Sequence, residues 1–201
     1  ITSIKEGAFC DYRQHSGFSS CSGGFGLTSV IMPDTITTIG GQAFAENKIE
    51  KVKLSTSLVT LDSTCYEYAA GACRNYAGVF RNNQLTQIEL PDTLVTIGKG
   101  TFEGNLLSNI TIPDSVTTID DKAFIGNQLA SIIIPNSVTT IGWIAFGHNK
   151  LNYVLINSGS KLTTISAWAF SSSNDTIAYN GTDNPNLKIY NNSGKAFDWN
   201  Y

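Results

Sequence analysis

The sequence predicts a β-rich solenoid in which short, similar coils stack on one another. Two phrases alternate along the 201 residues, L-x-x-I-x-I-P and V-T-T-I-G-x-x-A-F. Their copies return at a strict spacing, which is the sequence signature of a repeat architecture. Thr, Ser, Asn and Gly supply most of the polarity, and these residues suit turn-rich β structure better than helix. A unit of this size cannot bury its own apolar face, so the units must stack.

The spacing of the first phrase sets the register of the coils. The phrase begins at Leu27, Ile49, Leu85, Leu107, Leu129 and Leu151. Successive copies are 22 residues apart, except that Leu85 follows Ile49 by 36, one period plus an insertion of 14. In the second phrase Ile36 follows Ile1 by 35, one period plus 13. We therefore expect seven coils, the first incomplete, with one insertion in the first coil and one in the third.

Each phrase assigns its residues to the inside or the outside of the coil. In the first, alternation points Ile110 and Ile112 inward and Thr111 outward. The closing Pro113 stops the strand because proline cannot donate to a ladder.

The second phrase supplies a corner and a ring. The Gly that follows T-T-I is predicted to form a tight corner with an unusual backbone angle, at Gly40, Gly98 and Gly142. The Ala-Phe pair places one large ring in each coil. The predicted stack of rings consists of Phe44, Phe102, Phe124, Phe146 and Phe170.

An Asn stands two residues before each strand. A buried Asn that repeats coil after coil is suited to satisfy the backbone groups of the turns beside it, so we predict a structural role. The five are Asn47, Asn83, Asn105, Asn127 and Asn149.

The combined pattern L-x-x-I-x-I-P…V-T-x-I-G-x-x-A-F-x-x-N resembles the BspA-like class of leucine-rich repeats, from Ile1 to Phe170. Many members carry Cys where this chain has the Asn ladder. The resemblance implies a leucine-rich-repeat solenoid, a curved, right-handed coil with parallel strands and little α-helix. It also implies a place on the surface of bacteria or protozoan parasites and, often, adhesion to host proteins.

One domain is expected. Residues 1–170 form the predicted solenoid, with insertions near 10–26 and 65–79, and residues 171–201 form a C-terminal capping segment of the same domain. Within that segment Leu187 to Tyr201 is expected to fold over the last coil. Because Ile1 falls inside a repeat and is not a Met, we expect the chain to be part of a larger or processed protein.

All four cysteines lie in or beside the insertions. Of the three possible pairings, Cys10–Cys21 with Cys65–Cys73 is favoured because the two insertions belong to different coils. Each bridge would stabilise the fold by roughly 2–3 kcal/mol and indicates an oxidising environment. Zinc is the alternative, but neither pair has C-x-x-C spacing.

Several functional classes are disfavoured. A net charge of −3 without a basic run argues against nucleic acid, and no apolar stretch approaches the ~20 residues of a membrane span. His15 and His148 have no nucleophile placed beside them in the pattern, so no catalytic set, and hence no enzyme, is expected. No cofactor is expected. Calcium at Asn180 to Asn186 is the remaining metal alternative, although the D-x-D-x-D-G spacing is missing.

Binding is expected on the outward positions of the strands, which form one continuous surface in a solenoid. That row is basic near its start, polar in its middle and apolar near its end. The candidate partner-binding residues on it are Lys51, Lys53, Glu89, Ile133, Tyr153 and Leu155. The alternative for the apolar group is that the capping segment or an insertion covers it.

The second insertion is the other candidate surface. It carries Tyr68, Arg74 and Tyr76, side-chain types favoured at interface hot spots. Tyr66 has an alternative role, in the place of the coil's Phe. Trp143 and Trp168 are interpreted as packed against corners, with outer-surface contacts as the alternative.

The sequence thus predicts an extracellular, secreted or cell-surface module that binds a protein, with a host extracellular or matrix protein as the partner considered. A structural spacer is the first alternative, and it predicts an entirely polar strand face. A glycan- or cell-wall-binding module of a larger surface protein is the second, and it predicts exposed aromatic platforms.

Overall fold

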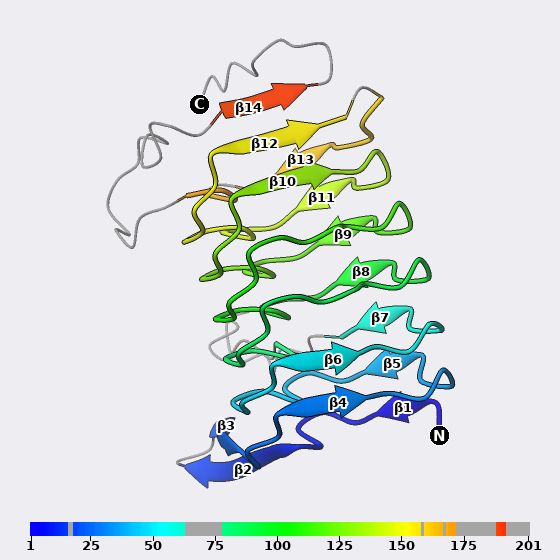
Figure 1. The fold of residues 1–201 in the computed structure, drawn as a ribbon, viewed down its shortest axis with the longest axis vertical. Helices are drawn as coiled ribbons and strands as arrows, with labels where there is room; N and C mark the ends of the chain where they lie inside the picture. Colours follow the sequence, from blue (N-terminus) through cyan, green and yellow to red (C-terminus); the bar gives the residue numbers. More distant parts are fainter. Residues whose placement is uncertain (16–17, 63–77, 158, 167, 172–187, 192–201) are drawn as a thin grey trace.

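The computed structural model describes residues 1–15, 18–62, 78–157, 159–166, 168–171 and 188–191. The chain winds through short coils that stack along one axis, and strands run in two rows on different sides of the stack (Figure 1). No helix occurs among the described residues. The predicted β-dominated repeat solenoid is therefore confirmed.

The V-T-T-I phrase builds what we call the back sheet, seven parallel strands of two residues each. They are β1 (Ser3–Ile4), β5 (Thr38–Ile39), β7 (Thr60–Leu61), β8 (Thr96–Ile97), β9 (Thr118–Ile119), β11 (Thr140–Ile141) and β13 (Thr164–Ile165). Each Thr or Ser pairs with the Thr of the next coil, and each Ile or Leu with the next Ile or Leu. From Ile39 to Ile141 the apolar member is fully buried, so this row closes one side of the core.

The L-x-x-I-x-I phrase builds the front row, which is less regular than predicted. β4 (Ser29–Ile31) pairs with β6 (Lys51–Lys53), and β10 (Ser131–Ile134), β12 (Tyr153–Ile156) and β14 (Lys188–Asn191) form a second parallel sheet. Residues 85–90 and 107–112, between these sheets, are fully described but form no strand. The outward side chains there are polar and include one β-branched residue, so they offer little apolar surface for packing across strands; they are Gln87, Glu89, Asn109 and Thr111.

The first insertion forms an antiparallel hairpin of β2 (Cys10–His15) and β3 (Phe18–Gly24). A β-bulge interrupts its register between Asp11 and Tyr12. The second insertion lies outside the described residues, apart from its borders.

One phenylalanine from each coil stacks along the core. The stacked rings are Phe9, Phe44, Phe80, Phe102, Phe124, Phe146 and Phe170. Neighbouring centroids are 4.9 to 5.9 Å apart and the ring planes lie within 19° of each other, a favourable spacing for stacked aromatic rings. The five predicted members are confirmed. The interpretation of Tyr66 as a stack member is wrong: Phe80 stands between Phe44 and Phe102, because the insertion precedes the coil's Ala-Phe position.

The predicted Asn ladder is also confirmed, and Asn105 shows its geometry. Its Oδ1 accepts from the Leu85 N–H of the preceding coil at 3.1 Å. Its Nδ2 donates to the carbonyls of Phe80 in the preceding coil and of Phe102 and Glu103 in its own. Asn47, Asn83, Asn127 and Asn149 repeat this arrangement.

The prediction that the corner glycines Gly40, Gly98 and Gly142 adopt an unusual backbone angle is wrong, because none of them has a positive φ. Left-handed backbone occurs instead two residues before six of the seven stacked Phe and, in the middle coils, two residues after the Phe, with φ between 51° and 69°. The first set is Gly7, Gln42, Gly100, Lys122, Ile144 and Trp168, and the second is Glu46, Asn82, Gly104, Gly126 and His148. Gly40 and Gly142 are required for a steric reason instead: a Cβ at either position would collide with the backbone of the preceding coil.

Candidate interaction surface

We call the outward side chains of the front row the strand face. It begins with Ile31, which is 80 % exposed, and with Lys51 and Lys53, both exposed on β6. Glu89 and Thr111 continue it on the coils that have no front strand, and both are exposed. Three of the six predicted strand-face residues, Lys51, Lys53 and Glu89, therefore lie on this surface.

The C-terminal end of the strand face is apolar and aromatic. Ile133 on β10 is 51 % exposed and Tyr153 on β12 is 43 % exposed, while Leu155 is half-buried. In the parallel register Ile133 pairs with Leu155, and Leu155 pairs with Tyr190 of β14. We call Ile133, Tyr153, Leu155 and Tyr190 the C-terminal patch.

The structure adds two residues that the sequence interpretation did not place on this surface. β14 belongs to the segment predicted to fold over the last coil, but residues 188–191 extend the front row beside β12. Lys188 pairs with Tyr153 and is exposed, and Tyr190 is half-buried. The signal was present: Lys188 follows Tyr153 by 35 residues, the same period plus 13 that separates Ile1 from Ile36.

Carboxylates accompany the lysines at the N-terminal end of the strand face. Asp34 accepts a hydrogen bond from the Thr56 N–H at 3.0 Å, and this bond, together with the charge of Lys53, lowers the pKa of Asp34. Glu89 occupies the place of Lys53 on the following coil. The basic start of the row is thus locally compensated.

The second predicted surface lies outside the described residues: Cys65, Tyr66, Tyr68, Cys73, Arg74 and Tyr76 all fall there. Arg81, at the border of that insertion, is engaged along the stack. Its guanidinium lies 3.3 Å from the Glu46 carboxylate and 3.5 Å from the Glu103 carboxylate. Arg81 therefore ties three consecutive coils together.

Trp143 lies at the corner that follows the back sheet, away from the strand face. It is 38 % exposed, and the Lys122 ammonium lies 5.0 Å from its ring centroid. The backbone N–H of Trp143 donates to Asp121 Oδ1 at 2.7 Å. Burial of the neighbouring Asp120 carboxyl raises its pKa. Trp168 is half-buried in left-handed backbone at the same corner of the next coil.

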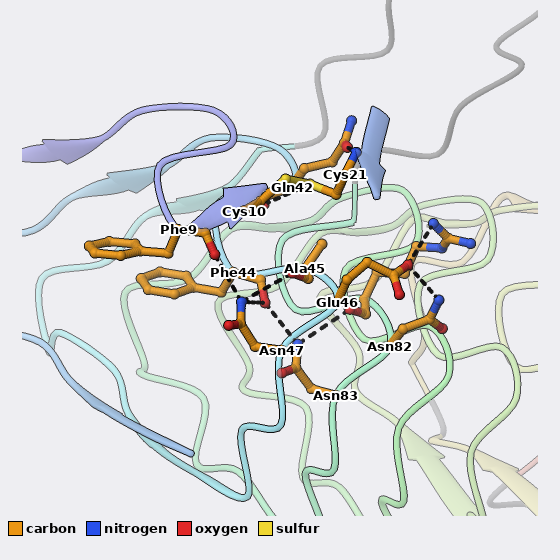
Figure 2. Close-up of a disulfide and its surroundings, with 11 residues drawn as sticks. Phe9, Cys10, Cys21, Gln42, Phe44, Ala45, Glu46, Asn47, Asn82 and Asn83 are labelled. Atoms are coloured by element: carbon orange, nitrogen blue, oxygen red, sulfur yellow. Dashed lines mark hydrogen bonds and ion pairs between the residues drawn. A yellow bond between two sulfur atoms is a disulfide. The ribbon is translucent and has the colours of Figure 1, made fainter. Parts of the chain in front are cut away.

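The disulfide between Cys10 and Cys21 closes the β2–β3 hairpin, as the favoured pairing predicts for this insertion. Figure 2 shows it beside Gln42, whose Oε1 accepts from the Cys21 N–H at 2.9 Å. The Gly24 N–H donates to the Glu46 carbonyl. Two residues near the end of β3, Cys21 and Gly24, therefore attach the hairpin to the second coil.

Among the described residues, no three His, Cys, Asp or Glu side chains gather closely enough to hold a metal ion. The proposed calcium segment, Asn180 to Asn186, lies outside them. The described part of the chain also contains no helix long and apolar enough to span a membrane.

Comparison with known proteins agrees with the geometry of the coils. The sequence model of the BspA type leucine rich repeat region matches residues 1–72 and 75–193 in six copies. No curated protein matches the chain significantly. The matched range includes β14, which continues the front row. The chain therefore belongs to the family of BspA type leucine rich repeat proteins.

Proposed function

We propose that this chain is an extracellular or cell-surface module that binds a protein partner through its strand face. The observation that carries the proposal is the C-terminal patch on three paired strands, where Ile133 and Tyr153 are exposed and Leu155 and Tyr190 are half-buried. Exposed apolar residues that gather on one surface mark contact sites for partners. The proposal is for binding without catalysis.

The patch has the composition and rigidity that favour tight contacts. Tyrosine is enriched at interface hot spots, and the patch contains Tyr153 and Tyr190. Their strands pair in register, with the buried Val154 and Ile156 of β12 between the outward positions. A surface held by a sheet loses little conformational freedom on binding, which leaves more of the interaction energy for affinity.

The disulfide supports a location outside the reducing cytoplasm. Cys10 is 4 % exposed, and it bridges to Cys21 in a hairpin attached to the second coil. Structural disulfides persist in secreted and surface proteins and are rare in the cytosol. Adhesion to a host extracellular or matrix protein is the specific form of the proposal, in keeping with the resemblance to surface-placed repeats.

The two alternatives have less support. A spacer would present an entirely polar strand face, whereas Ile133 and Tyr153 are exposed on it. A glycan platform built from Tyr153, Trp143 and Trp168 would need these rings on one surface. Tyr153 lies on the front row and the two tryptophans lie at a corner, where Lys122 already stands over Trp143.

The test measures binding of the purified chain to a panel of extracellular-matrix proteins and polysaccharides. The variant is Tyr153→Ala with Leu155→Ala, and the matched control is Gln87→Ala with Thr111→Ala, from the polar middle of the same face. Saturable protein binding that the first variant weakens by at least about 30-fold, and the control leaves intact, is expected for hot-spot residues. Thermal unfolding verifies that both variants are folded.

Two results would contradict the proposal. Binding to polysaccharides alone would favour the glycan module, and the absence of binding to any panel member would favour the spacer.

A further inference from the structure

We propose that the C-terminal patch recognises a protein segment that combines apolar side chains with a carboxylate, and that Lys188 is the residue that receives this carboxylate. The inference rests on the proposed function and adds the chemical character of the partner. Lys188 pairs with Tyr153 in the β12–β14 register, so it stands at the edge of the patch.

The strand face offers no acidic neighbour for Lys188 on its last four coils. Their outward pairs are Asn109 and Thr111, Ser131 and Ile133, Tyr153 and Leu155, and Lys188 and Tyr190. None is a carboxylate, and no ion pair of Lys188 occurs among the described residues. Lys188 is exposed, pairs with Tyr153 and lies two residues from Tyr190 on the same strand.

The lysines at the other end of the same face differ in this respect. Lys53 lies close enough to Asp34 to lower the pKa of that carboxyl, and Glu89 follows it on the next coil. A carboxylate that approached Lys53 would meet these two like charges. Charge complementarity therefore directs an acidic group to the C-terminal end, where no carboxylate of the described residues compensates the cation.

The patch also provides the setting in which such a contact becomes selective. Adjacent strands lie about 4.8 Å apart, so the ammonium of Lys188 is within reach of a group seated over Tyr153 or Tyr190. An apolar partner excludes water there, and an ion pair is stronger at lower effective dielectric. A lysine in place of the carboxylate would be opposed by like-charge repulsion, which is costly at an interface.

The experiment uses an array of twelve-residue peptides. Each peptide carries Leu and Tyr at varied spacing and one central position occupied by Glu, Gln or Lys. The full chain is compared with Lys188→Glu and, as matched control, with Lys53→Glu, which makes the same charge change on the same face. We expect the Glu peptides to bind about tenfold more tightly than their Gln counterparts, and the Lys peptides to bind least.

The variants separate the possible explanations. Lys188→Glu should reverse the preference toward Lys peptides, and Lys53→Glu should leave it unchanged. Equal binding of the Glu, Gln and Lys peptides, or binding by none of them, would overturn the role of Lys188. If binding is indifferent to charge but lost in Tyr153→Ala with Leu155→Ala, the proposed function stands and only this inference fails. If that double variant also binds normally, both fail.

Discussion

At the scale of single residues, the ladder Asn explains why the coils keep one register. Each ladder side chain joins two coils by four hydrogen bonds, and Asn105 does so at 2 % exposure. Only an amide presents an acceptor and two donors on one short, neutral side chain. This role was predictable, because each Asn keeps a fixed distance from the Phe and Leu of its coil.

Substitution of Asn105 should therefore be far more damaging than the same change at an exposed Asn. Asn105→Ala leaves the Leu85 N–H without its partner, at about 1–3 kcal/mol. It also removes one of the two amides that donate to the Phe80 carbonyl and one of the two that donate to the Phe102 carbonyl. We expect the free energy of unfolding to fall by about 2–4 kcal/mol in chemical denaturation, from one unsatisfied N–H and the loss of further hydrogen bonds.

Asn105→Asp adds a test, because the direction in which its stability depends on pH can be predicted. An ionised carboxylate would face the same carbonyl oxygens, so its folded-state pKa should rise. The loss of stability due to the charge should shrink as the pH falls from that raised pKa to the unfolded value of about 4. Asn109→Asp, at an exposed site on the strand face, is the control and should change stability little. An equal loss in both variants would contradict the ladder's role.

At the corner positions, the sequence did not indicate which residues adopt left-handed backbone. The left-handed position before the stacked Phe is Gly in only two of the six coils where it is described, Gly7 and Gly100. The others place Gln42, Lys122, Ile144 or Trp168 there. Stacking overrides their preference for other backbone angles, so residue type alone did not reveal the corner.

At the scale of elements, the spacing of the two phrases predicts the regular coils, but it does not predict where within a coil an insertion falls. Within the third coil, Cys65-Tyr66 and Val79-Phe80 both fit the Ala-Phe position, and only the Asn three residues after Phe80 distinguishes them. β14 was missed for a related reason, since an inserted segment separates it from its period. The absence of strands at residues 85–90 and 107–112 was not predicted either, because these residues repeat the same phrase as the neighbouring strands.

The hairpin element yields a prediction about its disulfide. Cys10 and Cys21 are 11 residues apart and their Cα atoms lie 5.6 Å apart, within the usual range for a bridge. Replacing both by Ser should lower the free energy of unfolding by roughly 2–3 kcal/mol, since a loop of this length is released in the unfolded chain.

The control for that prediction is reduction. Dithiothreitol should lower the thermal midpoint of the unmodified chain and should have less effect on the double Ser variant, which retains only the second pair of cysteines. An unchanged midpoint after replacement of Cys10 and Cys21 would show that the hairpin contributes nothing to stability.

At the scale of the whole molecule, one stack of aromatic rings and one ladder of amides hold the two rows of strands at a common spacing. The back sheet runs through all seven coils, whereas the front row groups apolar outward residues on neighbouring strands only at β10, β12 and β14, and Ile31 stands apart from them on β4. The sequence predicted the gradient along this face. The structure added β14, and with it Lys188 and Tyr190, whose spacing from β12 the sequence interpretation had not used.

The account's central claim is that binding takes place on the C-terminal part of the strand face. Amide hydrogen exchange, measured with and without a matrix protein found in the panel, tests it most directly. We predict that binding slows exchange in residues 131–134, 153–156 and 188–191 and leaves residues 29–31 and 51–53 unchanged. Slower exchange confined to the hairpin, the back sheet or the N-terminal part of the face would contradict the claim.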